Sequence, residues 1–167
     1  FSGIQIIQKT KGIVMVLENV FTKESIIIGL ESTEKDELFE EMVEAIHSLH
    51  PDFDRAEVLS ALEEREAQMS TGIMHSVAVP HAFAPSVNGT IGAIGISKNG
   101  IDYDSLDGSP VHVVFMLLAG NGQTEKHIQI LKSLALLIQK NGFVDKLVSC
   151  QSQSEAYNLI VQTEEAV

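Results

Sequence analysis

The chain carries one nearly continuous apolar run, VHVVFMLLA, from Val111 to Ala119. Turn-forming residues flank this run, with Asp107-Gly108-Ser109-Pro110 before it and Gly120-Asn121-Gly122 after it. A strand that is apolar on both faces is typical of the middle of a sheet that is covered on both sides. The run therefore predicts a buried central strand.

Two amphipathic helices are predicted before this strand. The first begins near Thr33, where Thr33-Glu34-Lys35-Asp36 offers a cap, and Pro51 ends it. The second begins at about Asp54 and stops before Ser70-Thr71-Gly72. Apolar residues recur along both at helical spacing: Leu38, Phe39, Met42, Val43, Ile46 and Leu49 in the first, and Val58, Leu59 and Leu62 in the second.

Shorter apolar segments between these helices and the central strand predict further strands. The alternation from Ile73 to Val79, ended by Pro80, is typical of a strand, and so is the run Ile91–Ser97. Lys98-Asn99-Gly100 predicts a turn, after which Ile101–Leu106 forms a short link.

Three helices are predicted after the central strand. A strong helix follows Gly122, a short one spans Phe143–Cys150, and the last starts at Ser154. Helices before and after a buried strand predict the α/β class, with helices on both faces of the sheet. The apolar stripes of the first and last of these helices are Ile130, Leu131, Leu134, Leu137 and Ile138, and Ala156, Leu159 and Ile160.

The composition fits one folded domain and excludes several classes of partner. The 167 residues are 44% apolar and 20% charged, which is enough for a sizeable core, and no domain boundary is visible. We expect residues 15–167 to form a single domain, with residues 1–14 as an N-terminal extension. The net charge of −12 would repel a nucleic acid or an acidic membrane surface. The longest wholly apolar run, Val113–Ala119, is far shorter than the roughly 20 residues of a membrane span, so we expect no membrane insertion.

The only cysteine is Cys150, which excludes an internal disulfide and a cysteine-based zinc cluster. This usage is typical of a cytoplasmic protein. In a helix, Cys150 shares a face with Phe143 and Leu147, so we expect a buried thiol that belongs to the core.

Three polar residues are predicted to be partly buried or at the sheet rim. Arg65 continues the inward stripe of its helix, either with its charged end in solvent or as a guanidinium fork for an anion. His127 lies on the buried stripe in the first turn of its helix, where the electropositive end favours a neutral imidazole and an anion. His127 also fits a core histidine bonded to the main chain. His81 follows Pro80 at the expected strand end, where it is a nucleophile, a base or a polar edge.

The remaining histidines and motifs predict neither a metal site nor a nucleotide site. Glu44 and His47 form a Glu-x-x-His pair with no second copy, and His47 with His50 lacks a third ligand. His112 is expected to be structural. No Gly-x-Gly-x-x-Gly, Walker loop or Gly-x-Ser-x-Gly motif occurs, which excludes the corresponding nucleotide and hydrolase classes.

The segment from Ser70-Thr71-Gly72-Ile73 to Val77-Ala78-Val79-Pro80-His81 resembles the signature of a known family. The family is the enzyme IIA domains of the phosphoenolpyruvate-dependent sugar phosphotransferase system, of the fructose/mannitol type that includes the nitrogen-regulatory branch. The resemblance runs from about Met15 to Val167 and implies a mixed sheet of about five strands. Other pieces follow in the family's order: Leu62-Glu63-Glu64-Arg65-Glu66, Gly100-Ile101-Asp102-Tyr103, Asp107-Gly108-Ser109-Pro110-Val111 and Glu125-Lys126-His127.

The resemblance implies roles for the three polar residues. The family's phosphoacceptor histidine follows Val/Ile-Pro and maps to His81, its second active-site histidine maps to His127, and its arginine maps to Arg65. Neutral His81 would accept a phosphoryl group from the carrier HPr and pass it to an enzyme IIB partner, with no metal, nucleotide or other cofactor. His127 would donate a hydrogen bond to a phosphoryl oxygen, and Arg65 would add positive charge.

One segment departs from the family pattern. The family has Gly-x-Gly between Ile73 and Val77, where this chain has Met74-His75-Ser76. Because glycine serves where φ is positive or a backbone comes close, we expect the approach to His81 to be reshaped, with His75 either near the phosphate or solvated. Two alternatives stay open: a regulatory module whose phosphorylation state controls other proteins, and a ligand-binding or structural domain that carries no phosphate.

Overall fold

The computed structural model describes residues 17, 19–72 and 75–166 of the chain. Within these residues, one mixed sheet has five strands: β1 (Ile26–Ile28), β2 (Val77–Ala78), β3 (His81–Phe83), β4 (Thr90–Ile101) and β5 (Val111–Ala119). The helical elements are η1 (Lys23–Ser25), α2 (Lys35–Leu49), α3 (Arg55–Gln68), α4 (Thr124–Ile138), α5 (Phe143–Ser149) and α6 (Gln153–Glu165). The predicted α/β class and the mixed sheet are confirmed.

The predicted central strand, β5, holds the sheet together. It pairs with β4 in the antiparallel sense and, on its other side, with β2 and β3 in the parallel sense. The two short strands lie one after the other along the same edge of β5, with Val77 opposite Val113 and His81 opposite Leu117. His81 therefore lies on the outermost strand at this side of the sheet.

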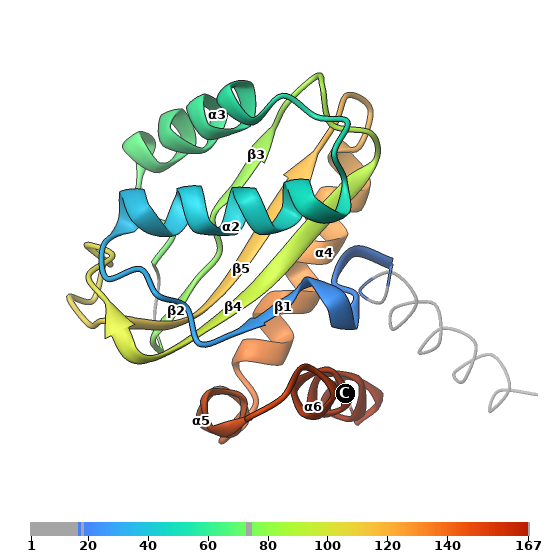
Figure 1. Cartoon of the computed structure of the whole chain (residues 1–167). Coiled ribbons are helices and arrows are strands. Elements are labelled where there is room, and N and C mark those ends of the chain that lie inside the picture. Colours follow the sequence, from blue (N-terminus) through green and yellow to red (C-terminus); the bar gives the residue numbers. More distant parts are fainter. Residues whose placement is uncertain (1–16, 18, 73–74, 167) are drawn as a thin grey trace, which may run out of the picture.

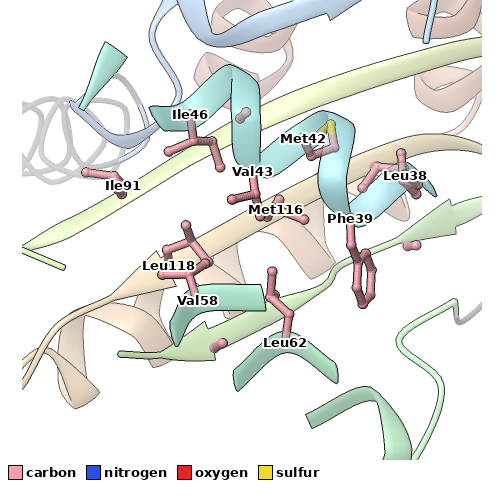
Figure 2. Close-up of a cluster of buried hydrophobic side chains, with 14 of the residues drawn as sticks. Leu38, Phe39, Met42, Val43, Ile46, Val58, Leu62, Ile91, Met116 and Leu118 are labelled. Carbon is pink, nitrogen blue, oxygen red and sulfur yellow. The ribbon is translucent and has the colours of Figure 1, made fainter. Parts of the chain in front are cut away.

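Two cores lie on opposite faces of the sheet because side chains along β5 alternate between them. Val114, Met116 and Leu118 pack with α2 and α3. Figure 1 shows these helices over the sheet, and Figure 2 shows the side chains of Met116 and Leu118 in this core. On the other face, the buried cluster joins the alternate β5 residues to side chains of α4, α5 and α6: Val113, Phe115 and Leu117 with Ile130, Leu134, Phe143, Leu147, Ala156 and Ile160. This burial on both faces explains the continuous apolar run of β5.

The strand predicted from Ile73 to Val79 is shorter than the sequence indicates. β2 begins only at Val77, because His75 and Ser76 have positive φ angles of 59° and 62°, while Ile73 and Met74 lie outside the described residues. Pro80 interrupts the strand but does not end it, since β3 resumes pairing with β5 at His81. The positive φ values fall where the family pattern has Gly-x-Gly.

Two local predictions are wrong. Lys98-Asn99-Gly100 does not end the strand, because Gly100 takes a φ of 86° and β4 continues to Ile101 with an irregular register. Thr33 does not cap the first helix: Glu34 is the N-cap and makes no side-chain capping bond, while the carbonyl of Thr33 accepts the N–H of Asp102.

Two further predictions concern the N-terminal extension and membrane insertion. The proposed extension, residues 1–14, lies outside the described residues. None of the helices in the described part of the chain is both long and apolar enough to cross a membrane.

The N-terminal cap of α3 provides a test of the fold. The side chain of Asp54 accepts a hydrogen bond from the N–H of Glu57, and the N–H of Asp54 bonds to the Ser86 hydroxyl in the loop after β3. Asp54→Ala should lower the free energy of unfolding by about 1 kcal/mol, the usual cost of losing such a cap. Urea unfolding measures this change, with Asp52→Ala as the exposed control. Equal stabilities for the two variants would show that the cap does not stabilise α3.

Candidate functional site

His81 is held at the start of β3 by a bond to its own backbone. Its Nδ1 lies 2.7 Å from the carbonyl oxygen of Val79. Because a carbonyl only accepts, Nδ1 carries the hydrogen and donates it. In the neutral ring, Nε2 is then unprotonated, and it makes no hydrogen bond to any described residue. His81 thus presents a free nitrogen lone pair.

His127, in the first turn of α4, brings its ring next to that of His81. The ring centroids of His81 and His127 are 5.4 Å apart. Residues 77, 79, 81 and 83 share one face of the edge strand, because side chains alternate, and this is the face that α4 covers. Phe83 consequently packs on the His127 ring at a centroid distance of 4.5 Å while remaining 47% exposed.

The His127 side chain is buried and unpartnered. It is 2% exposed, and neither ring nitrogen has a hydrogen-bond partner among the described residues. Burial, together with the nearby His81, lowers the pKa of His127 to about 4. His127 is therefore neutral near pH 7, with one N–H and one lone pair that nothing in the described protein satisfies.

Arg65 provides the positive charge. It lies in the last turn of α3, which packs beside β3, and its Nη1 donates to the Met69 carbonyl at 3.1 Å. Burial lowers the pKa of His81 and the charge of Arg65 lowers it further, while the bond to Val79 and the charge of Glu66 act in the opposite direction. The structure thus places the predicted histidines in contact range and Arg65 within electrostatic reach of His81.

The other histidines and the cysteine that the sequence singled out lie away from this pair of rings. Nδ1 of His112 donates to the Ser97 carbonyl at 2.9 Å, His47 packs edge-on against Phe53, and Cys150 is buried as predicted. His75 is exposed. Among the described residues, no group of three His, Cys, Asp or Glu side chains is arranged to hold a metal ion.

Several residues near the site were not predicted from the sequence. Phe83 was identifiable, because it lies two positions after His81 and so on the same face of a strand. The hydrogen-bonded cluster of Glu66, Thr71 and Tyr103 was not predicted either, because the sequence does not distinguish Glu66 from its solvated acidic neighbours.

The arrangement combines a nucleophilic nitrogen, a neutral buried hydrogen-bond donor and a fixed positive charge. These groups suit an anionic group on the nucleophile, because charge-assisted hydrogen bonds and a guanidinium stabilise phosphoryl oxygens.

Comparison with known sequences places this chain in a family. The profile of the family described as "Phosphoenolpyruvate-dependent sugar phosphotransferase system, EIIA 2" matches residues 19–163. The chain belongs to this family. The family performs phosphoryl transfer as a phosphocarrier, and the resemblance inferred from the sequence is confirmed.

Both branches of this EIIA family are among the similar proteins. The chain is 36% identical over 148 residues to the fructose-specific EIIABC component of Bacillus subtilis, covering 89% of this chain but only 23% of that protein. It is 26% identical over 148 residues to the nitrogen regulatory protein of Pseudomonas aeruginosa, covering 89% of this chain and 96% of that protein.

Solved structures share this fold. The nitrogen regulatory protein IIA-Ntr of Neisseria meningitidis superposes with a TM-score of 0.81 at 26% identity, covering 87% of this chain and 99% of that one. The mannitol enzyme IIA of Escherichia coli, determined in complex with phosphorylated enzyme IIB, has a TM-score of 0.73 at 21% identity, covering 86% of this chain and 99% of that one, and so shares the fold.

The neutral state of His127 predicts a pH dependence in this EIIA domain. An unfolded histidine has a pKa near 6.5, whereas the pKa of His127 in the folded protein is lowered to about 4. Between these values the unfolded chain binds more protons, so protonation of His127 in the unfolded chain lowers the free energy of unfolding progressively as the pH falls from 6.5 towards 4. In an NMR titration, the His127 ring signals should begin to shift only below about pH 5.

His127→Phe is the matching control. Relative to this variant, the wild type should lose up to about 3 kcal/mol of unfolding free energy between pH 6.5 and pH 4. A His127 midpoint near 6.5, or an unchanged difference, would contradict the buried neutral state.

Proposed function

We propose that His81 accepts a phosphoryl group on Nε2 from phosphorylated HPr and passes it to an enzyme IIB partner. The observation that carries this proposal is the Nδ1–H bond from His81 to Val79, which leaves Nε2 as the free nucleophile beside His127. The choice of IIB as acceptor follows the similar mannitol IIA, whose structure includes phosphorylated IIB.

The reaction forms one bond and breaks one. Nε2 of His81 attacks the phosphorus as the phosphorus–nitrogen bond to the HPr histidine breaks, and the electron pair of that bond returns to the HPr ring. Nδ1 keeps its hydrogen and its bond to Val79 throughout. Since the transition state is loose and highly charged, catalysis rests on positioning and charge stabilisation. In this proposal the chain's own residues supply both, without a metal or nucleotide.

His127 and Arg65 would stabilise the phosphoryl oxygens. The unpartnered N–H of His127 would find its acceptor in a phosphoryl oxygen, so the cost of burying it without a partner is relieved when His81 is phosphorylated. Arg65, already anchored at Met69, would add a positive charge that needs little reorganisation.

A second candidate is a regulatory IIA whose phosphorylation state controls other proteins. Similarity keeps this candidate, because the chain is 26% identical over 148 residues to a nitrogen regulatory protein and superposes on IIA-Ntr of Neisseria meningitidis with a TM-score of 0.81. In either role we propose a cytoplasmic protein in which residues 15–167 form a single domain, a range that contains the family match at 19–163.

Incubation with phosphoenolpyruvate, enzyme I and HPr tests the phosphorylation. Intact mass should show one added phosphate that is stable at neutral pH and lost in acid. His81→Ala should abolish this gain, and His127→Ala should still bind HPr but accept the phosphate about 100-fold more slowly, the usual effect of losing one transition-state donor.

The control is His75→Ala, which removes an exposed histidine near the site in sequence and should leave the rate unchanged. A folded wild-type protein that gains no phosphate would leave the structural or ligand-binding alternative, and normal phosphorylation of His127→Ala would remove its role.

A further inference from the structure

A buried hydrogen-bond network surrounds the side chain of Thr71, which precedes β2 in the chain. Glu66, in the last turn of α3, accepts two bonds from Thr71: its Oε1 lies 2.9 Å from the Thr71 N–H nitrogen, and its Oε2 lies 2.7 Å from the Thr71 hydroxyl. Lys35 of α2 pairs with the same carboxylate at 3.0 Å. Tyr103, from the segment after β4, lies 2.7 Å from the Thr71 hydroxyl. The network therefore joins α2, α3 and two loop segments.

The direction of each bond follows from counting protons. The Thr71 hydroxyl gives its only hydrogen to Glu66, so Tyr103 must donate to the Thr71 oxygen, with a longer contact of 3.3 Å to Glu66. Burial, and then the charge of Glu66, raise the pKa of Tyr103, which keeps its hydroxyl protonated as this direction requires. The Thr71 hydroxyl thereby both donates and accepts a hydrogen bond.

The backbone of Thr71 connects this network to His81. The carbonyl of Thr71 accepts the N–H of Val79 at 3.0 Å, and the carbonyl of Val79 accepts Nδ1–H of His81. Val79 is thus fixed at both of its backbone polar groups, one by the Thr71 segment and one by the catalytic-site ring. A shift of Thr71 would therefore be expected to change where the Val79 carbonyl points.

The space around Thr71 leaves little room for such a shift. A Cβ added to Gly72 would lie 2.7 Å from the Tyr103 ring and 2.8 Å from the Ser105 side chain. Tyr103 is itself almost completely buried and packs edge-on against Phe39 of α2. Packing against the aromatic ring and the hydrogen bonds therefore both restrain Thr71 and Gly72.

We propose that Glu66, Thr71 and Tyr103 are positioning residues for His81, which hold Val79 so that its carbonyl fixes the His81 hydrogen on Nδ1 and leaves Nε2 free. The proposal rests on the proposed function for its effect on phosphorylation, but its effect on the tautomer does not. The hydrogen bond on one ring nitrogen decides which nitrogen is protonated, so loosening Val79 admits the tautomer with hydrogen on Nε2, which cannot attack phosphorus.

Thr71→Val is the direct test, because it removes the hydroxyl and keeps the branched shape. Thr163→Val is the matched control, since it removes a hydroxyl that bonds only to the Leu159 carbonyl of its own helix, α6. Nitrogen-15 NMR of the His81 ring should show the Nδ1–H form in the wild type and the control, and a mixture in Thr71→Val. With phosphorylated HPr as donor, the kcat of Thr71→Val should fall at least about tenfold with an unchanged KM, by analogy with the loss of a hydrogen bond that orients a metal-bound histidine.

Tyr103→Phe is the second variant, since it keeps the ring packing and removes only the hydroxyl. It decides the question by the same two readouts if Thr71→Val does not fold. An unchanged His81 tautomer in the folded variant would overturn the positioning role, whether or not the rate falls, and a mixed tautomer with an unchanged rate would overturn its part in phosphorylation. If the folded wild type gains no phosphate, the proposed function fails separately, and the tautomer alone then decides whether the network positions His81.

Discussion

The bond from His81 Nδ1–H to the carbonyl of Val79 is the interaction on which the chemistry of the site depends. Pro80 makes this bond possible, because proline restricts the preceding residue to an extended conformation and donates no ladder hydrogen bond of its own. The strand is interrupted between β2 and β3, while the Pro80 carbonyl still accepts the N–H of Leu117. The interruption turns Val79 towards the histidine ring without detaching the segment from β5.

The two layers of helices supply complementary groups to that ring because it lies at the sheet edge. α4 brings a neutral, buried His127 against His81 and Phe83, and α3 brings the charge of Arg65 from the other layer. An unpartnered buried imidazole is unfavourable by about 1–3 kcal/mol. In the proposed relay, this unfavourable state is relieved only when a phosphoryl group arrives, so the same arrangement that weakens the resting protein would stabilise the phosphorylated one.

The sequence predicted the parts that follow from periodicity and missed those that follow from local geometry. The apolar run of β5 and the apolar stripes of the helices predicted the α/β class, since burial on one or two faces of an element gives its apolar residues a regular spacing in the sequence. The positive φ angles of His75 and Ser76 were not readable from those residue types, and the continuation of β4 past Gly100 depended on pairing with β5. His81, His127 and Arg65 were identified as partly buried polar groups, but spacing alone left each with a structural alternative. Glu66, Thr71 and Tyr103 come together only in three dimensions, so no spacing rule could have joined them.

The most direct measurement is the position of the phosphoryl group on the His81 ring of the phosphorylated protein. Phosphorus-31 and nitrogen-15 NMR of ring-labelled histidine distinguish the two ring nitrogens and the six histidines of the chain. A phosphoryl group on Nε2 of His81, with hydrogen retained on Nδ1, is the expected result. A phosphoryl group on Nδ1 of His81 would mean that the Val79 bond breaks during the reaction, and one on another residue would contradict the assignment of His81 as the acceptor.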